Sequence, residues 1–358
     1  MSAPLLVEIR RRIEQAGPMS MADYMELALG DPAHGYYPTR DPFGGKGDFI
    51  TAPEISQMFG EIVGIWTAHM WGALGRPAPF AFIELGPGRG TLMADMLRAG
   101  SLAPGFAEAA RVHLVETSPA LRCRQRAALR EADVPVSWHQ SFAEVPPGPM
   151  ILVANEFFDA LPVHQYARAQ DGWRERVVGL DPAGHLSLQT AETRSILAEF
   201  GQAEPGTVVE ISPQRAAFSA EIGARLAQSG GAALIIDYGY SGPAPGDTFQ
   251  AVKGHAYADP LENPGEADLT AHVDFAALCG AARAAGARSY GPITQAAFLT
   301  ALGIAVRADK LKVARPDQAA KIDAALARLI GPDEMGTLFK VAALTGPAGP
   351  PPPPFAGD

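Results

Sequence analysis

The sequence contains little cysteine, no long apolar run and no recognisable export signal. Its two cysteines, Cys123 and Cys279, lack a CxxC spacing, which argues against a disulfide framework and predicts reduced thiols. No segment approaches the roughly 18 apolar residues that cross a bilayer. Residues 1–17 lack the apolar stretch and small-residue cleavage site of a signal peptide. We therefore predict a cytoplasmic protein that is not integral to a membrane, with no metal site.

Positive charge is also scarce. Lysine and arginine total 29 against 39 aspartates and glutamates, which leaves a formal net charge of -10. We expect no general nucleic-acid surface, because such a charge opposes phosphate binding. A basic or neutral protein partner fits this charge better, and a homodimer is left open.

The length of the chain predicts more than one simple domain. With 358 residues and 47% hydrophobic content, it can build a substantial core. We predict a helical N-terminal part over residues 1–75 that includes a lid loop, and a principal domain over residues 76–344. That domain should carry an antiparallel insertion at about 163–205 and a helical insertion at about 294–335. The proline-rich tail, residues 345–358, should be disordered.

Apolar runs of strand length alternate with helical segments from residue 81 onward, which predicts an α/β fold with a parallel sheet and crossover helices. The expected strands are 81–85, 112–116, 136–140, 150–156 and 233–239, with 339–344 as a closing strand that could pair with 287–293. Ahead of them, Thr51 and Glu54 form a capping-box signature. Apolar residues at spacings of three and four then predict one long helix over 52–74.

The first expected strand runs into GPGRGT (residues 86–91), a glycine-rich turn that opens a helix. Such a turn holds a nucleotide-like ligand, because glycine permits positive φ and close backbone approach. A dinucleotide fingerprint would need glycine or alanine in place of Thr91. The ExGxGxG spacing, which starts at Glu84, instead resembles the S-adenosylmethionine loop of class I methyltransferases. This resemblance assigns cofactor binding to Gly86, Gly88 and Gly90, and places Glu84 near the cationic amino group.

Three further residues at strand ends are candidates for cofactor binding. Glu116 ends the second strand, where an acid accepts both ribose hydroxyl groups. Phe142 follows the third strand and could flank the adenine, although a core position suits it equally well. Asn155 ends the fourth strand, and capping of the next helix is its structural alternative.

The fourth strand continues into NEFFDALP (residues 155–162), which sets an amide, two carboxylates and two aromatic rings directly after a buried run. In open parallel sheets the ligand lies at the carboxyl ends of the strands. Glu156 could therefore hold an acceptor guanidinium by paired hydrogen bonds, with Asp159 as the second candidate. Capping of the strand end is again the structural alternative.

Longer motifs carry a more specific resemblance. ELGPGRGTLMAD, VANEFFDALPVHQY, IIDYGY, DLTAHVDF and the early HGYY…GDFITAPEISQMFGE closely resemble the MidA-like methyltransferases, the family of the mitochondrial complex I assembly methyltransferase, over roughly Ser20 to Leu344. The resemblance implies a Rossmann-like class I methyltransferase sheet of about seven strands with the last one antiparallel. It also implies S-adenosyl-L-methionine as cofactor and arginine of a complex I subunit as acceptor.

One departure concerns the acceptor site. Glu156 resembles the first acid of the double-glutamate loop of protein arginine methyltransferases, but the second acid of that loop would fall at Gln165. Asp159 or His272 would then supply the missing contact, because a histidine can orient a carboxylate or the acceptor. A helix cap involving Asp274 is an equal alternative for the segment around His272.

Together these observations predict a bacterial, cytoplasmic protein arginine methyltransferase that acts on a subunit of a complex I-type NADH dehydrogenase during assembly. Its expected catalytic residues are Glu156, Asp159 and His272. The alternative is an assembly or interaction protein that binds the cofactor with little turnover. An NAD-dependent oxidoreductase is disfavoured by Thr91.

Overall fold

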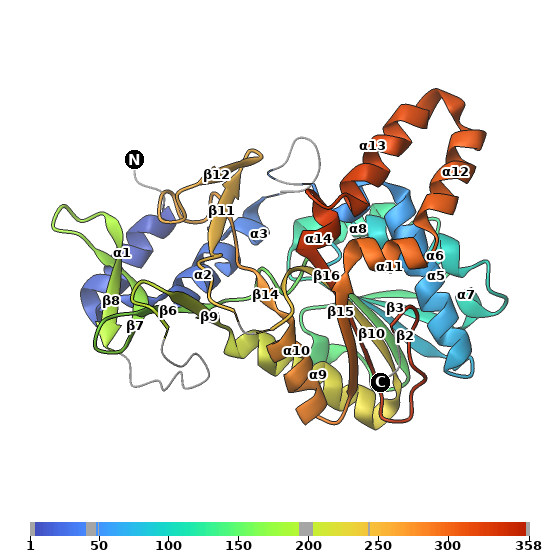
Figure 1. Ribbon diagram of the computed structural model, residues 1–358, viewed down its shortest axis with the longest axis horizontal. Helices are drawn as coiled ribbons and strands as arrows, with labels where there is room; N and C mark the ends of the chain where they lie inside the picture. Colours follow the sequence, from blue (N-terminus) through green and yellow to red (C-terminus); the bar gives the residue numbers. More distant parts are fainter. Residues whose placement is uncertain (1–3, 41–47, 49, 193–202, 243, 356–358) are drawn as a thin grey trace. The chain divides into compact units, whose positions relative to one another are not determined.

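The computed structural model describes residues 4–40, 48, 50–192, 203–242 and 244–355. It contains two compact units, which are described separately (Figure 1). The N-terminal unit comprises Met1–Phe49, Asp159–Ala216 and Gly242–His272, and the sheet unit comprises Ile50–Phe158, Ala217–Ser241 and Val273–Asp358. Each unit collects segments that are discontinuous in the sequence. Our division of the chain into consecutive domains stays a prediction. Most of the expected lid loop lies outside the described residues.

The sheet unit is built on one mixed sheet. Its strands are β2 (Phe80–Leu85), β3 (Ala110–Val115), β4 (Val136–His139), β5 (Met150–Asn155), β10 (Gly231–Tyr240), β14 (Val273–Asp274), β15 (Arg288–Thr294) and β16 (Phe339–Thr345). The order is β15-β16-β10-β5-β2-β3-β4, and β14 pairs with the end of β10. Neighbours from β4 to β10 are parallel, whereas β16 is antiparallel to β10 and β15. The predicted class I methyltransferase fold is confirmed.

Burial explains why these strands were visible in the sequence. Every residue of β5 is buried, as are the first seven of β10. Parallel strands in the middle of a sheet are covered on both faces and therefore read as continuous apolar runs.

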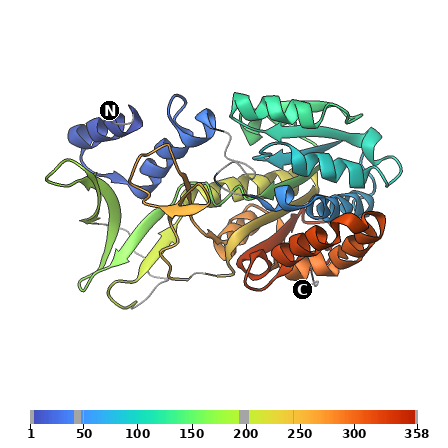
Figure 2. The same cartoon turned by 90° about the horizontal axis from the view of Figure 1, so that it is seen from above.

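Helices surround this sheet and form hairpins at its edge. They are α4 (Ala52–Ile55), α5 (Gln57–Ala73), α6 (Thr91–Gly100), α7 (Phe106–Ala109), α8 (Pro119–Ala128), η1 (Phe142–Glu144), α10 (Phe275–Ala284), α11 (Gln295–Ala301), α12 (Ile304–Ala314), η3 (Pro316–Gln318), α13 (Ala319–Ile330) and α14 (Met335–Leu338). α9 (Pro213–Ser229) has residues in both units. Figure 1 and Figure 2 show α12 and α13 side by side as a helical hairpin.

The N-terminal unit combines helices with antiparallel sheets. Its helices are α1 (Pro4–Ala16), α2 (Met21–Gly30) and α3 (Tyr36–Thr39), and its strands are β1 (Met19–Ser20), β6 (His164–Arg168), β7 (Trp173–Leu180), β8 (Leu186–Glu192), β9 (Val208–Ile211), β11 (Gln250–Lys253), β12 (Ala256–Ala258) and β13 (Asp268–Thr270). The strands β6 to β9 pair antiparallel, and the bounds of the predicted insertion stay a prediction. The side chain of Ser20 caps α2 by accepting the backbone N–H of Asp23 at 3.0 Å.

The helix predicted over 52–74 is broken in the structure. Ser56 adopts an extended conformation, with φ -163° and ψ 139°, and separates α4 from α5. Its hydroxyl accepts the backbone N–H of Met58 at 3.2 Å and so caps the second helix. The apolar periodicity continues through the break, which is why it gave no sign of an interruption.

The prediction of a disordered tail is wrong as far as Phe355. The carbonyl of Pro353 accepts the indole N–H of Trp66 at 2.7 Å. Phe355 is only 7% exposed and belongs to the main hydrophobic cluster. Proline has no backbone N–H to donate, so carbonyls of a proline-rich segment can accept bonds from the domain on which it lies. Among the described residues, no helix is long and apolar enough to cross a bilayer.

Candidate active site

The glycine-rich turn has the backbone that the sequence predicted. Gly86, Gly88 and Gly90 have φ values of 59°, 51° and 84°, in the left-handed region that side chains disfavour. Gly90 donates its N–H to the carbonyl of Pro87 at 2.7 Å, and α6 begins at the next residue. The turn therefore presents backbone where a ligand needs close approach.

The turn is also packed closely from two sides. A Cβ at Gly86 would lie 3.1 Å from Cδ2 of Phe157, in the NEFFDALP segment. A Cβ at Gly90 would lie 3.2 Å from the Cα of Gln125 in α8. Phe157 therefore packs against the cofactor loop, as expected for a segment at the carboxyl edge of the sheet.

Two buried oxygen atoms near this loop have no hydrogen-bond partner within the described residues. They are Oε2 of Glu84, on β2, and Oδ1 of Asn155, at the end of the adjacent strand β5. Glu84 is 3% exposed and accepts the backbone N–H of Met93. Buried polar atoms without a partner are rare. Two acceptors at neighbouring strand ends fit the cationic amino group of S-adenosylmethionine.

The protonation of Glu84 is set by its surroundings. Burial, together with the nearby carboxylate of Glu116, raises the pKa of its carboxyl group to about 8, despite the opposing effect of the Met93 hydrogen bond. A bound ammonium group would reverse this effect by favouring the charged form. The site is thus suited to a cationic ligand and not to a phosphate.

Glu116 lies just beyond β3, where the sequence placed a ribose-binding acid. Its Oε1 accepts the backbone N–H of Ser118 at 2.7 Å, and its Oε2 accepts Nε2 of Gln125 at 3.1 Å. Burial raises the pKa of this carboxyl group, and these hydrogen bonds oppose the increase. The Gln125 amide also donates to the carbonyl of Gly88 at 2.8 Å. It therefore joins the acid to the glycine turn.

Sequence reasoning missed Gln125. It lies in the arginine-rich helix α8, whose composition is typical of a solvated face, yet it is fully buried. Its Oε1 accepts the indole N–H of Trp138 at 2.9 Å. The hydrogen-bonding partners come from three separate elements, so no local pattern could have identified it.

Phe142 is buried, with 1% of its surface exposed. Its ring stacks on Phe218 at a centroid distance of 5.9 Å, and the Arg225 guanidinium lies 4.6 Å from its ring centroid. These contacts support the core alternative for this side chain. Its role beside the adenine stays a prediction.

Glu156 occupies a strained position at the end of β5. Its φ is 50°, a left-handed conformation that costs a residue with a side chain roughly 1–3 kcal/mol. Its backbone N–H donates to the carbonyl of Ile236 at 2.9 Å. Its Oε1 accepts Nδ2 of Asn155 at 3.0 Å and the backbone N–H of Ala52 at 3.1 Å. The carboxylate thus caps α4, a helix distant in the sequence, whereas the structural alternative considered for it was capping of the strand end.

The turn that carries Glu156 is held by a residue that sequence reasoning missed. Asp237, in β10, is fully buried. Its Oδ2 accepts the backbone N–H groups of Phe157 and Phe158 at 3.2 and 3.0 Å, and its Oδ1 accepts that of Tyr238 at 2.9 Å. The available signal was an acid directly after an apolar run in IIDYGY.

The other two catalytic candidates belong to the N-terminal unit, where Arg215 brings their segments together. Arg215 is 6% exposed. It donates from Nη2 to the carbonyl of Asp159 at 2.9 Å and from Nη1 to that of His272 at 2.6 Å. The backbone N–H of Ala271 also donates to the Asp159 carbonyl at 3.1 Å. The roles of Asp159 and His272 in catalysis stay predictions.

Gln165, at the position expected of a second loop glutamate, has a structural environment in the N-terminal unit. It is 1% exposed, and its Nε2 donates to Glu210 at 2.8 Å and to Asp247 at 2.9 Å. Its Oε1 accepts Nη1 of Arg176 at 3.2 Å. A neutral amide that donates on one side and accepts on the other suits this environment. Nowhere in the described ranges do three His, Cys, Asp or Glu side chains gather as they would around a metal ion.

Comparison with known proteins agrees with this geometry. A family model described as an S-adenosyl-L-methionine-dependent methyltransferase matches residues 62–293. The mitochondrial protein arginine methyltransferase NDUFAF7 of Danio rerio is 38% identical, covering 94% of this chain and 85% of its own. The Homo sapiens protein of the same name is 39% identical, with 95% and 83% covered. A Burkholderia thailandensis structure with bound S-adenosyl-homocysteine superposes with a TM-score of 0.85 and 30% identity, covering 95% of this chain and 91% of that one.

These relatives correct our prediction of a cytoplasmic protein. The curated relatives are named mitochondrial proteins from animals. They give no support to the bacterial origin that we expected. Free thiols occur in more than one compartment, so the cysteines could not establish the cytoplasm.

The loop geometry, the unpaired acceptors and the family match agree on one cofactor, S-adenosyl-L-methionine. The chain belongs to the family of S-adenosyl-L-methionine-dependent methyltransferases.

Proposed function

We propose that this methyltransferase modifies an arginine side chain of a protein substrate. The observation that carries the proposal is the carboxylate of Glu156, fixed at the end of β5 beside a segment that packs on the cofactor loop. Guanidinium, with a pKa above about 12, stays charged at neutral pH. A carboxylate is the group that binds it best, through paired charge-assisted hydrogen bonds.

The chemistry follows from this placement. Bound S-adenosylmethionine supplies a methyl group on a positively charged sulfur. With this cofactor bound, a guanidinium nitrogen would form a bond to the methyl carbon as the carbon–sulfur bond breaks; S-adenosylhomocysteine would be the leaving group, and the nitrogen would release its proton to solvent. Glu156 would bind the guanidinium and draw its positive charge toward the nitrogens that do not react. The protein otherwise contributes alignment and exclusion of water.

We propose that Glu84, Asn155 and the three loop glycines hold the methionine end of the cofactor, and that Glu116 accepts the ribose hydroxyl groups. Asp159 or His272 would supply the second contact to the acceptor. Gln165 is not proposed for this role, because its buried amide already bridges Glu210 and Arg176.

The relatives named protein arginine methyltransferases support the choice of acceptor. We propose a subunit of a complex I-type NADH dehydrogenase as substrate during its assembly, on the motif resemblance. The reading as a cofactor-binding assembly protein with little turnover is not favoured, since the curated relatives are named as enzymes. A homodimer stays a prediction that the mass of the protein in solution would test.

The proposal is tested by transfer of labelled methyl from S-adenosylmethionine into an extract of cells that lack this protein. Hydrolysis then identifies the labelled amino acid. Label on arginine in one band of the size of a dehydrogenase subunit is the expected result. Label on another residue type would contradict the arginine assignment, and no label would favour an acceptor available only during synthesis or the reading without turnover.

A further inference from the structure

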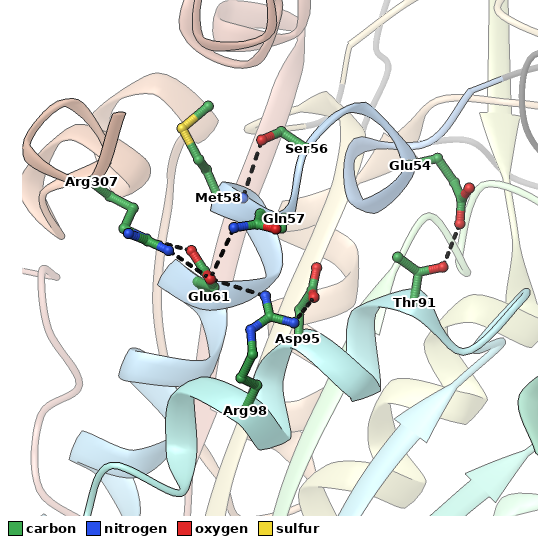
Figure 3. Close-up of polar contacts among 9 residues, drawn as sticks. All are labelled: Glu54, Ser56, Gln57, Met58, Glu61, Thr91, Asp95, Arg98 and Arg307. Atoms are coloured by element: carbon green, nitrogen blue, oxygen red, sulfur yellow. Dashed lines mark hydrogen bonds and ion pairs between the residues drawn. The ribbon is translucent and has the colours of Figure 1, made fainter. Parts of the chain in front are cut away.

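The short helix α4 lies between the cofactor loop and Glu156 within the sheet unit. The sequence assigned Glu54 to a capping box with Thr51, but Thr51 makes no capping bond from its side chain. Instead, Oε1 of Glu54 accepts the hydroxyl of Thr91 at 2.6 Å, as Figure 3 shows. Its Oε2 lies 3.8 Å from Nη1 of Arg89. Both partners belong to the glycine turn and the start of α6.

The other end of α4 is tied to the acceptor carboxylate. The backbone N–H of Ala52, its first residue, donates to Oε1 of Glu156 at 3.1 Å. Ala52 is fully buried, so this end of the helix is fixed in the core. One helical turn therefore contacts the cofactor loop through its third residue and Glu156 through its first.

A helix of four residues has little stability of its own, because nucleation costs more than one turn of hydrogen bonds returns. The break at Ser56 also separates it from the long helix α5. The position of α4 therefore depends on its contacts with neighbouring elements, which include the polar contacts at its two ends. Loosening one end should change the position of the group held at the other.

We propose that Glu54 is a positioning residue for methyl transfer. Through α4, it fixes the position of the Glu156 carboxylate relative to the cofactor loop. This inference rests on the proposed function of Glu156 as the group that binds the acceptor. A charged carboxylate suits the role, since its hydrogen bond from Thr91 is stronger than one between neutral groups.

A second ion-pair cluster, which also involves α6, offers a matched control. Glu61 of α5 accepts Nη2 of Arg98 at 3.0 Å and Nη2 of Arg307 at 3.0 Å, and Figure 3 shows these contacts. Arg98 lies in α6, like Thr91, but near its opposite end. Arg98→Gln therefore removes a charged contact of α6 without touching the loop.

The experiment measures the Kd of S-adenosylmethionine by calorimetry, together with kcat at saturating cofactor. Glu54→Ala should raise the Kd and lower kcat, each by about tenfold, as loss of a hydrogen bond to a charged group would do. Glu54→Gln should recover part of both losses, because its amide oxygen can still accept the Thr91 hydroxyl. Thr91→Val should raise the Kd similarly, and the double variant should add little, because both changes remove one interaction. Arg98→Gln should lower the melting temperature and leave the Kd unchanged.

The outcomes that would overturn the proposal can be told apart. Unchanged Kd and kcat in Glu54→Ala would overturn the proposal, and so would an equal rise of Kd in Arg98→Gln, which would indicate a general effect on stability. A raised Kd with normal kcat would overturn the link to Glu156. Absence of methyl transfer by the wild-type protein would contradict the proposed function. In that case, a raised Kd in Glu54→Ala would still show that the contact of Glu54 with the loop supports cofactor binding.

Discussion

The buried carboxylate of Asp237 accepts the backbone N–H of Phe158 at 3.0 Å and thereby fixes the turn that presents Glu156. Two further backbone N–H groups bind the same carboxylate. Both of its oxygens are used, so an isosteric amide cannot replace it. The side-chain NH₂ of an asparagine at this position would face a backbone N–H, so two donors would oppose each other.

We therefore expect Asp237→Asn to lower the free energy of unfolding by about 1–3 kcal/mol, the cost of a buried donor without a partner. Methyl transfer should fall further than this loss implies, because the turn carrying Glu156 loosens. Urea unfolding and a transfer assay check the two effects. Asp274→Asn is the control, because asparagine caps a helix as well as aspartate does, and Asp274 caps α10. Equal behaviour of the two variants would contradict this account of Asp237.

Gly88→Val should weaken S-adenosylmethionine binding by tenfold or more, because a β-branched residue resists the left-handed conformation at φ 51°. Calorimetry gives the affinity directly. Gly72→Ala, a helical position with open space around it, should bind the cofactor normally. Unchanged affinity in Gly88→Val would show that the cofactor does not bind at this turn.

Cofactor binding should release a proton from Glu84 at pH 7. Without ligand its pKa is raised to about 8, so the carboxyl group is mostly protonated, and the cationic amino group of the cofactor would favour the carboxylate. Calorimetry in buffers of different ionisation enthalpy measures the released proton. Glu84→Gln should abolish this release, and an equal release from that variant would assign the proton to another group.

The same pKa shift gives a stability effect of known sign. The folded state holds the Glu84 proton more tightly than the unfolded chain, whose value is near 4.5. This contribution is fully present below that pH and is lost as the pH rises toward 8. Without cofactor, wild type should therefore lose more stability than Glu84→Gln between pH 5 and 8. A parallel pH dependence of the two proteins would contradict the raised pKa.

Gln165→Glu should not create the second acid of an arginine methyltransferase loop. It would place a buried carboxylate against Glu210 and Asp247, with Arg176 as the compensating charge. We expect a loss of about 1–3 kcal/mol at pH 7, because like charges disfavour each other in a buried site. The loss should shrink near pH 5, where the new group can bind a proton. A more stable or more active variant would contradict this reading.

The sequence predicted those features of the fold that depend on local pattern. Continuous apolar runs identified the central strands because burial on both faces leaves no polar positions. The candidate cofactor residues Glu84 and Glu116 were selected for a similar reason, since each lies at the end of such a run. The glycine turn was predicted from the spacing of its glycines, which permit the left-handed backbone conformation that the turn adopts.

The features that escaped prediction depend on partners distant in the chain. Glu54 has the spacing of a capping box, but Thr91 competes successfully for its carboxylate. Asp237 holds backbone groups 79 and 80 positions away. Gln125 and Arg215 act through bonds to loops and carbonyls of other segments, which leave no periodic signal in the sequence.

The most direct test of the central claim is the rate of methyl transfer by Glu156→Gln at saturating S-adenosylmethionine. The amide oxygen can still accept the Ala52 N–H, so the fold and cofactor affinity should be retained, while the charge that binds a guanidinium is lost. The account predicts a rate reduced by tenfold or more, about 1.4 kcal/mol in activation free energy, with unchanged cofactor Kd. A wild-type rate from this variant would contradict the role of Glu156 in binding the acceptor.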